Sequence, residues 1–453
     1  MEGNMALGFF KKSVKADLIL HNGVILTQDP DSPVASAVAC SQGKIIAVGD
    51  FESMDSLVDS NTQIIDLNQQ YVLPGLIDLL GSPVTDALKD NYLDLTQCSS
   101  SEQLCSMVGQ WDMKNQEAEI VFGYGYNEDV FEKETANAGE DAPKIVMEIL
   151  DGVCDSKPVV LLCKSTVSCL LNSAAAAIVK ETADEEMVQF ITVPYILNLL
   201  VPFDFEQIIQ KVDDSIKASL SSGFTSVVSL GSPDYFESIY QDALISLYNE
   251  DSLDQKFFGS YMMNRPLFPK GLVHRLMERK TMCNEIDGLI NATTLYVDLN
   301  QSQSPVEFSQ NSTDEILAAV ADKGFGIYIK AADEADFNMA VQGLEYIRGK
   351  GYKDTFTIES NFNPEKLSSE LMYSESAYYM PPLKDLCNLP IEDFIQTITI
   401  TAASIIDSEN SIGSIEVDKF ADMAVFSVDP MGLTPEELLA HSPNMTISNG
   451  KII

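Results

Sequence analysis

Histidine is scarce in this chain, because its 453 residues include only His21, His274 and His441. A hydrolytic metal site needs several imidazoles or carboxylates that hold one ion, and the bound ion then lowers the pKa of its water to about 7. The three histidines are far apart in the sequence: one in a turn motif, one in the charged segment VHRLMERK and one in a polar C-terminal segment. We interpret all three as surface or loop residues. The scarcity disfavours both a histidine-based metal site and a serine nucleophile activated by histidine.

The chain also has few positively charged residues and no long apolar run. Lys and Arg total 28 against 68 Asp and Glu, so the formal net charge is −40. That charge disfavours nucleic acid and anionic membranes as partners. No apolar run reaches membrane-spanning length, and no signal-peptide core follows Lys11, Lys12 and Lys15. We expect a soluble cytoplasmic protein whose partner is a small-molecule ligand, with a homo-oligomer as a further option.

The eight cysteines include no C-x-x-C pair. They are scattered through apolar or helical stretches, so buried free thiols are the expected state. Cys163 and Cys169 remain an alternative metal or redox pair, although their spacing matches no common ligand hairpin.

The two ends of the chain are rich in short β segments separated by turn signals. Near the N-terminus, His21-Asn22-Gly23 separates ADLIL from VILTQ, and Ser41-Gln42-Gly43 separates SAVAC from KIIAVGD. The C-terminal stretch has the same character, with ADMAVFSVD, MTIS, Asn449-Gly450 and KII. We predict hairpins at these turns, and pairing of the two ends into one small β unit built from residues 1–70 and 407–453.

Residues 71–406 alternate apolar strands with segments long enough for helices. The spacers EQIIQKVDDSIKASLSSG and TDEILAAVADKG end in glycine just before a strand, as helix stop signals do. This α/β pattern predicts a (β/α)8 barrel, with a doubly wound open sheet as the alternative. The predicted strands are 72–78, 119–126, 158–163, 224–231, 256–263, 293–299, 324–331, 354–360 and 377–382.

Several segments resemble the amidohydrolase superfamily. The end segments are ADLILHNGVILT, GKIIAVGD, IIDLNQQYVLPGLID, TITAASIIDSENSIGSIEVDKFADMAVFSVDP and TISNGKII. In that family both chain ends build a β-sandwich beside a metal-bearing (β/α)8 barrel. The middle segments SKPVVLLCKSTVSCLLNSAAAAI, GFTSVVSLG and GFGIYIKAADEADFNMAVQGLEY are similar to the branch of N-substituted formamide deformylase-like enzymes. The resemblance spans nearly the whole chain.

The chain departs from that family at its metal ligands. It keeps Pro74, Gly75 and Asp78 of the first barrel strand. No Asp aligns with the family's late metal ligand in a shortened region around 377–387. Where the resemblance places the family's histidines and bridging lysine, other residues stand: Leu80, Gly81 and Ser82 for His-x-His, then Val167, Thr294, Lys330 and Ser360. The resemblance therefore implies the fold, and a site without the metal ligands.

Charged residues at strand ends form the candidate site, since the carboxyl ends of barrel strands face the functional cleft. We expect the Lys330 ammonium to lie among carboxylates and to replace the positive charge of a metal. A cluster of ion pairs that only stabilises the fold is the alternative. The candidate residues are Asp78, Lys164, Asp298, Lys330 and Glu359.

Three functions are compatible with this pattern. The favoured one is a binder, regulator or scaffold related to amidohydrolases, with no cofactor and no metal hydrolysis. The second is a working hydrolase of non-peptide carbon–nitrogen bonds, whose carboxylates hold a divalent metal such as zinc. The third is a metal-free lyase or isomerase in which Lys330 and a carboxylate act as acid and base. The sequence does not specify the ligand.

Overall fold

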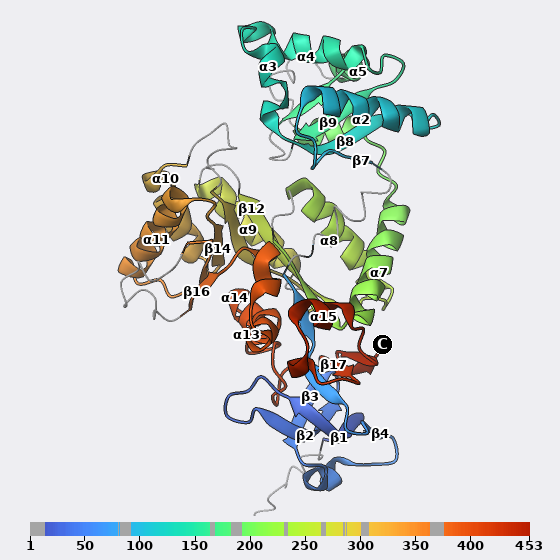
Figure 1. The fold of residues 1–453 in the computed structure, drawn as a ribbon, viewed down its shortest axis with the longest axis vertical. Helices are drawn as coiled ribbons and strands as arrows, with labels where there is room; N and C mark the ends of the chain where they lie inside the picture. The colour runs from blue at the N-terminus through green and yellow to red at the C-terminus, as the bar shows by residue number, and fades with distance from the viewer. Residues whose placement is uncertain are drawn as a thin grey trace, which may run out of the picture.

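A computed structural model of the chain shows three β-sheets with their helices, arranged one after another along the long axis (Figure 1). None of the helices in the described ranges is both long enough and apolar enough to cross a membrane. The described residues are 14–79, 81, 92–163, 168–182, 193–230, 234–263, 269–283, 286, 288–299, 308–362 and 376–453.

The two ends of the chain meet in one eight-stranded sheet, the end sheet. Strand β17 pairs antiparallel with β5, and β5 pairs parallel with β1, so N-terminal and C-terminal strands are directly hydrogen-bonded. The pairing of the two ends is confirmed, whereas a two-layered β-sandwich is not, because the described strands form one sheet. The strands are β1 (Leu18–Leu26), β2 (Val34–Ser41), β3 (Lys44–Gly49), β4 (Gln63–Asp66), β5 (Tyr71–Pro74), β17 (Met423–Phe426), β18 (Met445–Ser448) and β19 (Lys451–Ile452).

Two of the predicted turns are hairpins, and the third is not. Gln42-Gly43 joins β2 to β3 and Asn449-Gly450 joins β18 to β19, each with two residues at positive φ. The segment His21-Asn22-Gly23 instead lies inside β1, whose pairing with β2 shifts between His21 and Ile25. The expected hairpin there is wrong, because one residue at positive φ, Asn22, produces a bulge that the strand continues through.

The middle of the molecule is a curled parallel sheet of seven strands, with the order β16-β15-β14-β13-β12-β11-β6. Its outer face packs against helices α9 to α11, and its inner face packs against α13 and α14. The strands are β6 (Leu76–Asp78), β11 (Phe224–Ser229), β12 (Lys256–Met263), β13 (Ile290–Asp298), β14 (Gly326–Lys330), β15 (Phe356–Glu359) and β16 (Ala377–Met380).

The helices beside this sheet follow the sequence signals. Gly223 and Gly324, just after α7 and α10, have φ of 89° and 68°, which confirms both predicted stop signals. The helices are α7 (Phe205–Ser221), α8 (Asp234–Asn249), α9 (Pro269–Cys283), α10 (Gln310–Ala321), α11 (Glu334–Gly349), α13 (Ile391–Gln396), α14 (Ala402–Ile405) and α15 (Pro435–Ala440).

A separate four-stranded sheet holds two strands that we expected in the barrel. Strand β8 pairs with β9 and with the short β7, and β9 pairs antiparallel with β10. Strand β6 pairs instead with β11, in the curled sheet. The closed eight-stranded barrel is therefore not confirmed. The elements here are β7 (Leu93–Asp94), β8 (Val121–Tyr126), β9 (Val159–Cys163), β10 (Cys169–Leu171), α2 (Ser101–Lys114), α3 (Glu132–Thr135), α4 (Ala142–Asp151), α5 (Ser173–Thr182) and α6 (Val193–Leu200).

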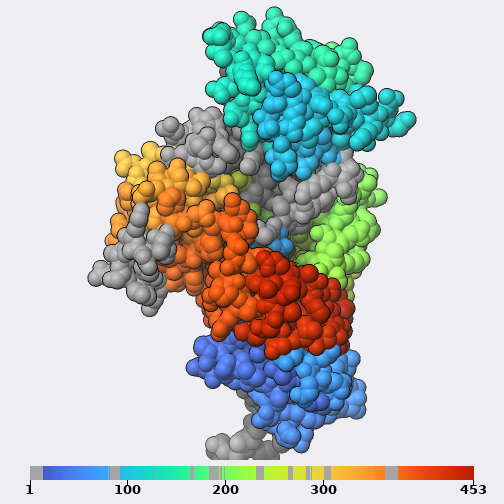
Figure 2. Space-filling model, viewed as in Figure 1, coloured from blue at the N-terminus to red at the C-terminus, as the bar shows by residue number. Residues whose placement is uncertain are grey.

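This four-stranded part and the end sheet lie at opposite ends of the molecule, with the curled sheet between them (Figure 2). Its strands still share a core with the curled sheet, since Phe122 and Leu162 belong to the same apolar cluster as Val227 and Phe257. Seven cysteines are free thiols, of which Cys163 is buried as expected and Cys169 is only partly buried.

Gly75 is the link between the end sheet and the curled sheet. A Cβ at this position would lie 2.1 Å from the Thr225 hydroxyl oxygen and 2.9 Å from Asp422 Cβ, so a side chain there would clash unless its neighbours moved. This close approach turns the chain from β5 directly into β6.

The two sheets are also joined by a buried ion pair at the amino end of β12. Lys256 Nζ lies 2.7 Å from a carboxylate oxygen of Asp422, with the lysine side chain fully buried and the aspartate 6% exposed. Lys256 also donates a hydrogen bond to the Asn449 side chain and lies 4.4 Å from the ring centre of Phe420. Burial lowers the pKa of Lys256, and Asp422 opposes that shift. This group of residues, the joint, ties the C-terminal strands to the curled sheet.

Candidate functional site

Three neighbouring strands place alternating polar residues on the inner face of the curled sheet. Because side chains two residues apart share a face, Tyr296 and Asp298 of β13 lie on one face, as do Tyr328 and Lys330 of β14. Asp298 is opposite Lys330, and Lys330 is opposite Glu359 of β15. The parallel pairing therefore brings two carboxylates and one ammonium together at the carboxyl ends of the strands. We call Asp298, Tyr328, Lys330 and Glu359 the strand-end cluster.

Lys330 and Asp298 form a partly exposed ion pair. Lys330 Nζ lies 3.6 Å from Asp298 Oδ2, and the side chains are 42% and 18% exposed. The Lys330 side chain is therefore partly exposed, and its ammonium carries three N–H donors.

Glu359 is the buried member of the strand-end cluster, with an exposed fraction of 5%. Tyr328 donates its hydroxyl hydrogen to Oε2 at 3.1 Å, and the backbone N–H of Leu383 donates to Oε1 at 3.2 Å. Burial raises the pKa of Glu359, whereas the two donors and Lys330 lower it. Glu359 is therefore a carboxyl group whose proton is held more tightly than that of an exposed glutamate.

Two tyrosines lie one row deeper on the same face. The ring centres of Tyr296 and Tyr328 are 5.5 Å apart, and both residues are buried. Burial, together with nearby Glu359, raises the pKa of both phenols well above the usual 10. These hydroxyls consequently stay protonated and act as donors near neutral pH.

Asp336, in the first turn of α11, is a buried carboxylate that our sequence reasoning missed. The residue is 1% exposed, and its Oδ2 accepts a hydrogen bond from the Ala332 backbone N–H at 3.2 Å. Burial raises its pKa to about 6, with contributions from the charges of Asp333 and Asp298. An Asp three residues after the helix cap Asp333 is the signal that could have marked it.

The remaining predicted site residues, Asp78 and Lys164, are not on the strands that carry the strand-end cluster. Asp78 ends β6, and strands β11 and β12 lie between β6 and β13 in the sheet. Lys164 lies outside the described residues, and it follows β9, which belongs to the four-stranded sheet. Leu80, Ser82 and Val167 also lie outside the described residues.

The described replacements for metal ligands are ordinary core or strand-end residues. Thr294 is 2% exposed, and Ser360, 8% exposed, accepts a hydrogen bond at its hydroxyl from the Phe362 N–H at 3.2 Å. The histidines lie elsewhere: His21 stacks on Phe51 with ring centres 4.3 Å apart, and His274 pairs with Glu278 at 3.3 Å. His441 is 6.4 Å from the Phe426 ring.

A divalent metal does not fit the strand-end cluster. Metal ions in such folds need several converging imidazoles or carboxylates, and the Lys330 ammonium next to Asp298 would repel a second cation. Within the ranges that the structure covers, no three His, Cys, Asp or Glu side chains are grouped so that they could hold a metal.

The fold is that of metal-dependent hydrolases. An uncharacterized metal-dependent hydrolase from Pyrococcus horikoshii superposes with a TM-score of 0.59 at 16% identity, covering 94% of this chain and 99% of that one. A second, from Pyrococcus furiosus, gives a TM-score of 0.56 at 16% identity over 91% and 99% of the two chains. These likenesses concern the fold alone.

Sequence comparison finds similarity to known proteins over parts of the chain. Residues 383–453 match the model of the amidohydrolase family. The chain is 25% identical to Protein LONG AFTER FAR-RED 3 of Arabidopsis thaliana over 48% of its own length and 39% of that protein. It is also 25% identical to the exoenzymes regulatory protein AepA of Pectobacterium carotovorum over 27% of each. The matches thus span well under half of these curated relatives. The family match thus concerns the last 71 residues, 383–453, and the structural likeness concerns the fold.

Proposed function

We propose that this protein is an amidohydrolase relative that binds a small molecule at the strand-end cluster without metal-dependent hydrolysis. One observation carries the proposal: the Lys330 ammonium lies 3.6 Å from Asp298, on the face where its family would direct metal ligands. An ammonium supplies positive charge and hydrogen-bond donors, but it cannot lower the pKa of a bound water as a divalent metal does. The name of AepA, a regulatory protein, is consistent with a binding role.

The cluster suits a ligand with a polar group that both donates and accepts hydrogen bonds. Lys330 presents solvent-facing donors, and Asp298 presents acceptors. Glu359 and Tyr328 lie deeper and hold each other through a hydrogen bond, so they stiffen the floor of the site. The proposal is that recognition depends on Lys330 and Asp298, with Glu359 as a positioning residue.

Metal analysis and activity assays of the purified full chain test the proposal together. We expect no stoichiometric zinc, iron or manganese, and no hydrolysis of N-formyl or N-acyl compounds above the blank rate. A metabolite screen by thermal shift should find a ligand whose stabilisation is lost in Lys330→Met but kept in Lys323→Met, a partly exposed lysine paired with Asp322. Stoichiometric metal, together with hydrolysis that chelation abolishes, would overturn the proposal.

A hydrolase of non-peptide carbon–nitrogen bonds is the second candidate. The match of residues 383–453 to the amidohydrolase family favours it, as does 40% identity over 63 residues to adenine deaminase 1 of Latilactobacillus sakei. That stretch covers 14% of this chain and 10% of the deaminase. On this alternative, metal would co-purify and Asp298→Asn would abolish both metal binding and turnover.

A further inference from the structure

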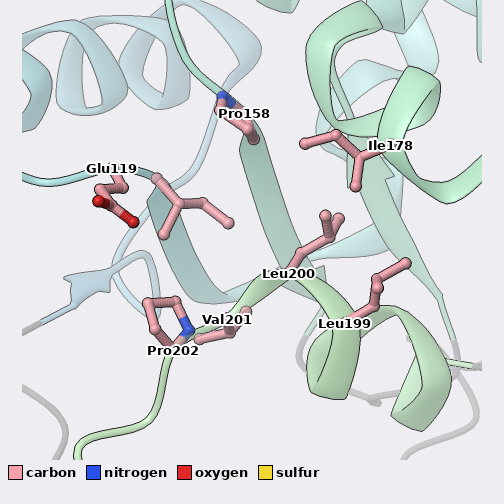
Figure 3. A pocket seen from close by; sticks show the side chains of 8 residues that line it. Glu119, Pro158, Ile178, Leu199, Leu200, Val201 and Pro202 are labelled. Carbon is pink, nitrogen blue, oxygen red and sulfur yellow. The ribbon is translucent and has the colours of Figure 1, made fainter. Parts of the chain in front are cut away.

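A pocket of about 350 Å³ lies in the four-stranded part of the molecule (Figure 3). It opens at the amino ends of β8 and β9, between α5 and the carboxyl end of α6. The strand-end cluster lies at the carboxyl ends of β13 to β15, so the two sites are built from different elements. A volume of this size is within the range of small-molecule sites, which is about 300 to 1,000 Å³.

Seven of the eight side chains that line the pocket are apolar, and several of them are partly exposed. Ile120 and Val201 are buried, with exposed fractions of 7% and 4%, while Leu200 is half-buried. Ile178 of α5 is 37% exposed at the pocket. Contact with a hydrocarbon group would remove this apolar surface from water, which is favourable.

Two acceptor groups lie at the pocket, the Glu119 carboxylate and the carboxyl end of α6. Pro158 and Pro202 have no backbone N–H, so neither can donate a hydrogen bond to a ligand. Glu119 contributes a carboxylate on one side, opposite Ile178 and Leu199 (Figure 3). Residues Leu199–Pro202 place the carboxyl end of α6 at the pocket, and that end of a helix carries partial negative charge.

The nearest lysine in the sequence is bound elsewhere. Lys157, which precedes Pro158, pairs with Asp112 at 2.8 Å and donates hydrogen bonds to the backbone carbonyls of Asn115 and Gln116. Its charge is therefore directed to the end of α2 and not to Glu119. The net charge of −40 adds a long-range attraction for cations.

We propose that this pocket binds a small amphiphilic amine, as a second site independent of the strand-end cluster. The hydrocarbon part lies against Ile120, Ile178 and Leu200, and the ammonium donates hydrogen bonds to Glu119 and the carboxyl end of α6. Glu119 and the carboxyl end of α6 both repel an anion of the same length. An alcohol has no charge and therefore gains no charge interaction with either group.

Titration calorimetry of the full chain with n-hexylammonium, 1-hexanol and hexanoate at low salt tests this order. We expect hexylammonium to bind one site, hexanol to bind about tenfold more weakly and hexanoate not to bind. Equal affinity for the three compounds would overturn the proposal, because hydrocarbon contact alone would then account for binding.

Variants locate the site and separate it from the strand-end cluster. Glu119→Gln should weaken hexylammonium binding about fivefold, the effect of one exposed charge pair. Glu117→Gln removes the same charge from an exposed position in the same loop, and it should change the affinity less than twofold. Ile178→Trp should abolish binding by filling the pocket, and Lys330→Met should leave it unchanged. If Glu119→Gln and Ile178→Trp both bind as the native chain does, the pocket is not the site.

Discussion

Two lysines at opposite ends of the same parallel sheet show how burial separates a structural charge from an available one. Lys256 begins β12 and Lys330 ends β14, and each pairs with an aspartate. The Lys256 side chain has no exposed surface, whereas that of Lys330 is 42% exposed. Every donor of a buried ammonium must be satisfied by the protein, while an exposed one can exchange water for a ligand. The amino end of the sheet therefore holds a buried cross-link, and the carboxyl end holds the candidate site.

The largest effect is expected from Lys256→Met. Removing one partner of a buried ion pair leaves the other charge uncompensated, which costs about 3 to 5 kcal/mol of unfolding free energy. Asp422 would be the uncompensated group, and Asn449 would lose a donor. Denaturant unfolding followed by circular dichroism measures the loss.

The exposed pair of Lys451 and Asp254, 3.1 Å apart, offers a matched control for that experiment. Lys451→Met should cost at most about 1 kcal/mol, as exposed pairs do. The double variant Lys256→Met, Asp422→Leu should recover part of the loss, because no charge is then left buried. A loss for Lys256→Met no larger than that for Lys451→Met would contradict the comparison.

Asp336 should make stability depend on pH between about 4 and 6. Its folded pKa of about 6 is above the unfolded value, so the folded state binds more protons in that window. Stability therefore falls as pH rises, by up to about 3 kcal/mol for a shift of roughly two units. Asp336→Asn should flatten the curve across the window, whereas Asp31→Asn in an exposed loop should retain the slope. Thermal unfolding at half-unit pH steps from 4 to 7 provides the measurement.

Tyr328→Phe probes the floor of the strand-end cluster. It removes one donor from buried Glu359 and should cost about 1.5 to 3 kcal/mol at pH 7, the range for a hydrogen bond to a charged group. That bond favours the ionised carboxylate, so the cost should shrink as pH falls through the raised pKa of Glu359. Tyr352→Phe, whose hydroxyl meets Asp322 at an exposed position, should change little at either pH. A cost for Tyr328→Phe that is equal at pH 7 and pH 4.5 would show that Glu359 does not accept this bond as a carboxylate.

The smallest change in stability is expected from Lys330→Met. Its pair with Asp298 is partly exposed, so the loss should be below about 1 kcal/mol. The same variant should lose ligand binding at the strand-end cluster. A loss of stability as large as that of Lys256→Met would mean that both lysines are structural, which would remove the contrast between the two ends of the sheet.

The strands could be predicted from the sequence, but their partners could not. Each predicted middle strand, from 72–78 to 377–382, overlaps a strand of the structure, because apolar runs bounded by glycine and turn residues report local conformation. Local patterns do not report which strand lies beside which. The segments 119–126 and 158–163 therefore looked like barrel strands, although they pair in a sheet of their own.

The candidate site was predictable in part for the same reason. Strand ends with alternating polar residues indicated Asp298, Lys330 and Glu359, whose strands are neighbours. The joint was missed because its groups are distant in sequence: Lys256 meets Asp422 across 166 residues and Asn449 across 193. A lysine at the start of KFFGSYMM reads as a solvent-facing strand end, and only tertiary packing buries it.

The pairing of β5 with β17 has a consequence for synthesis on the ribosome. β5 ends at Pro74 and its partner β17 begins at Met423, so the partner is made about 350 residues later. At roughly 5 to 20 residues per second, one edge of β5 waits about 20 to 70 s for its hydrogen-bonding partner. An unpaired edge of this kind can pair with another chain in the meantime. During synthesis β5 is thus exposed to pairing with other chains, although in the complete sheet it lies between β17 and β1.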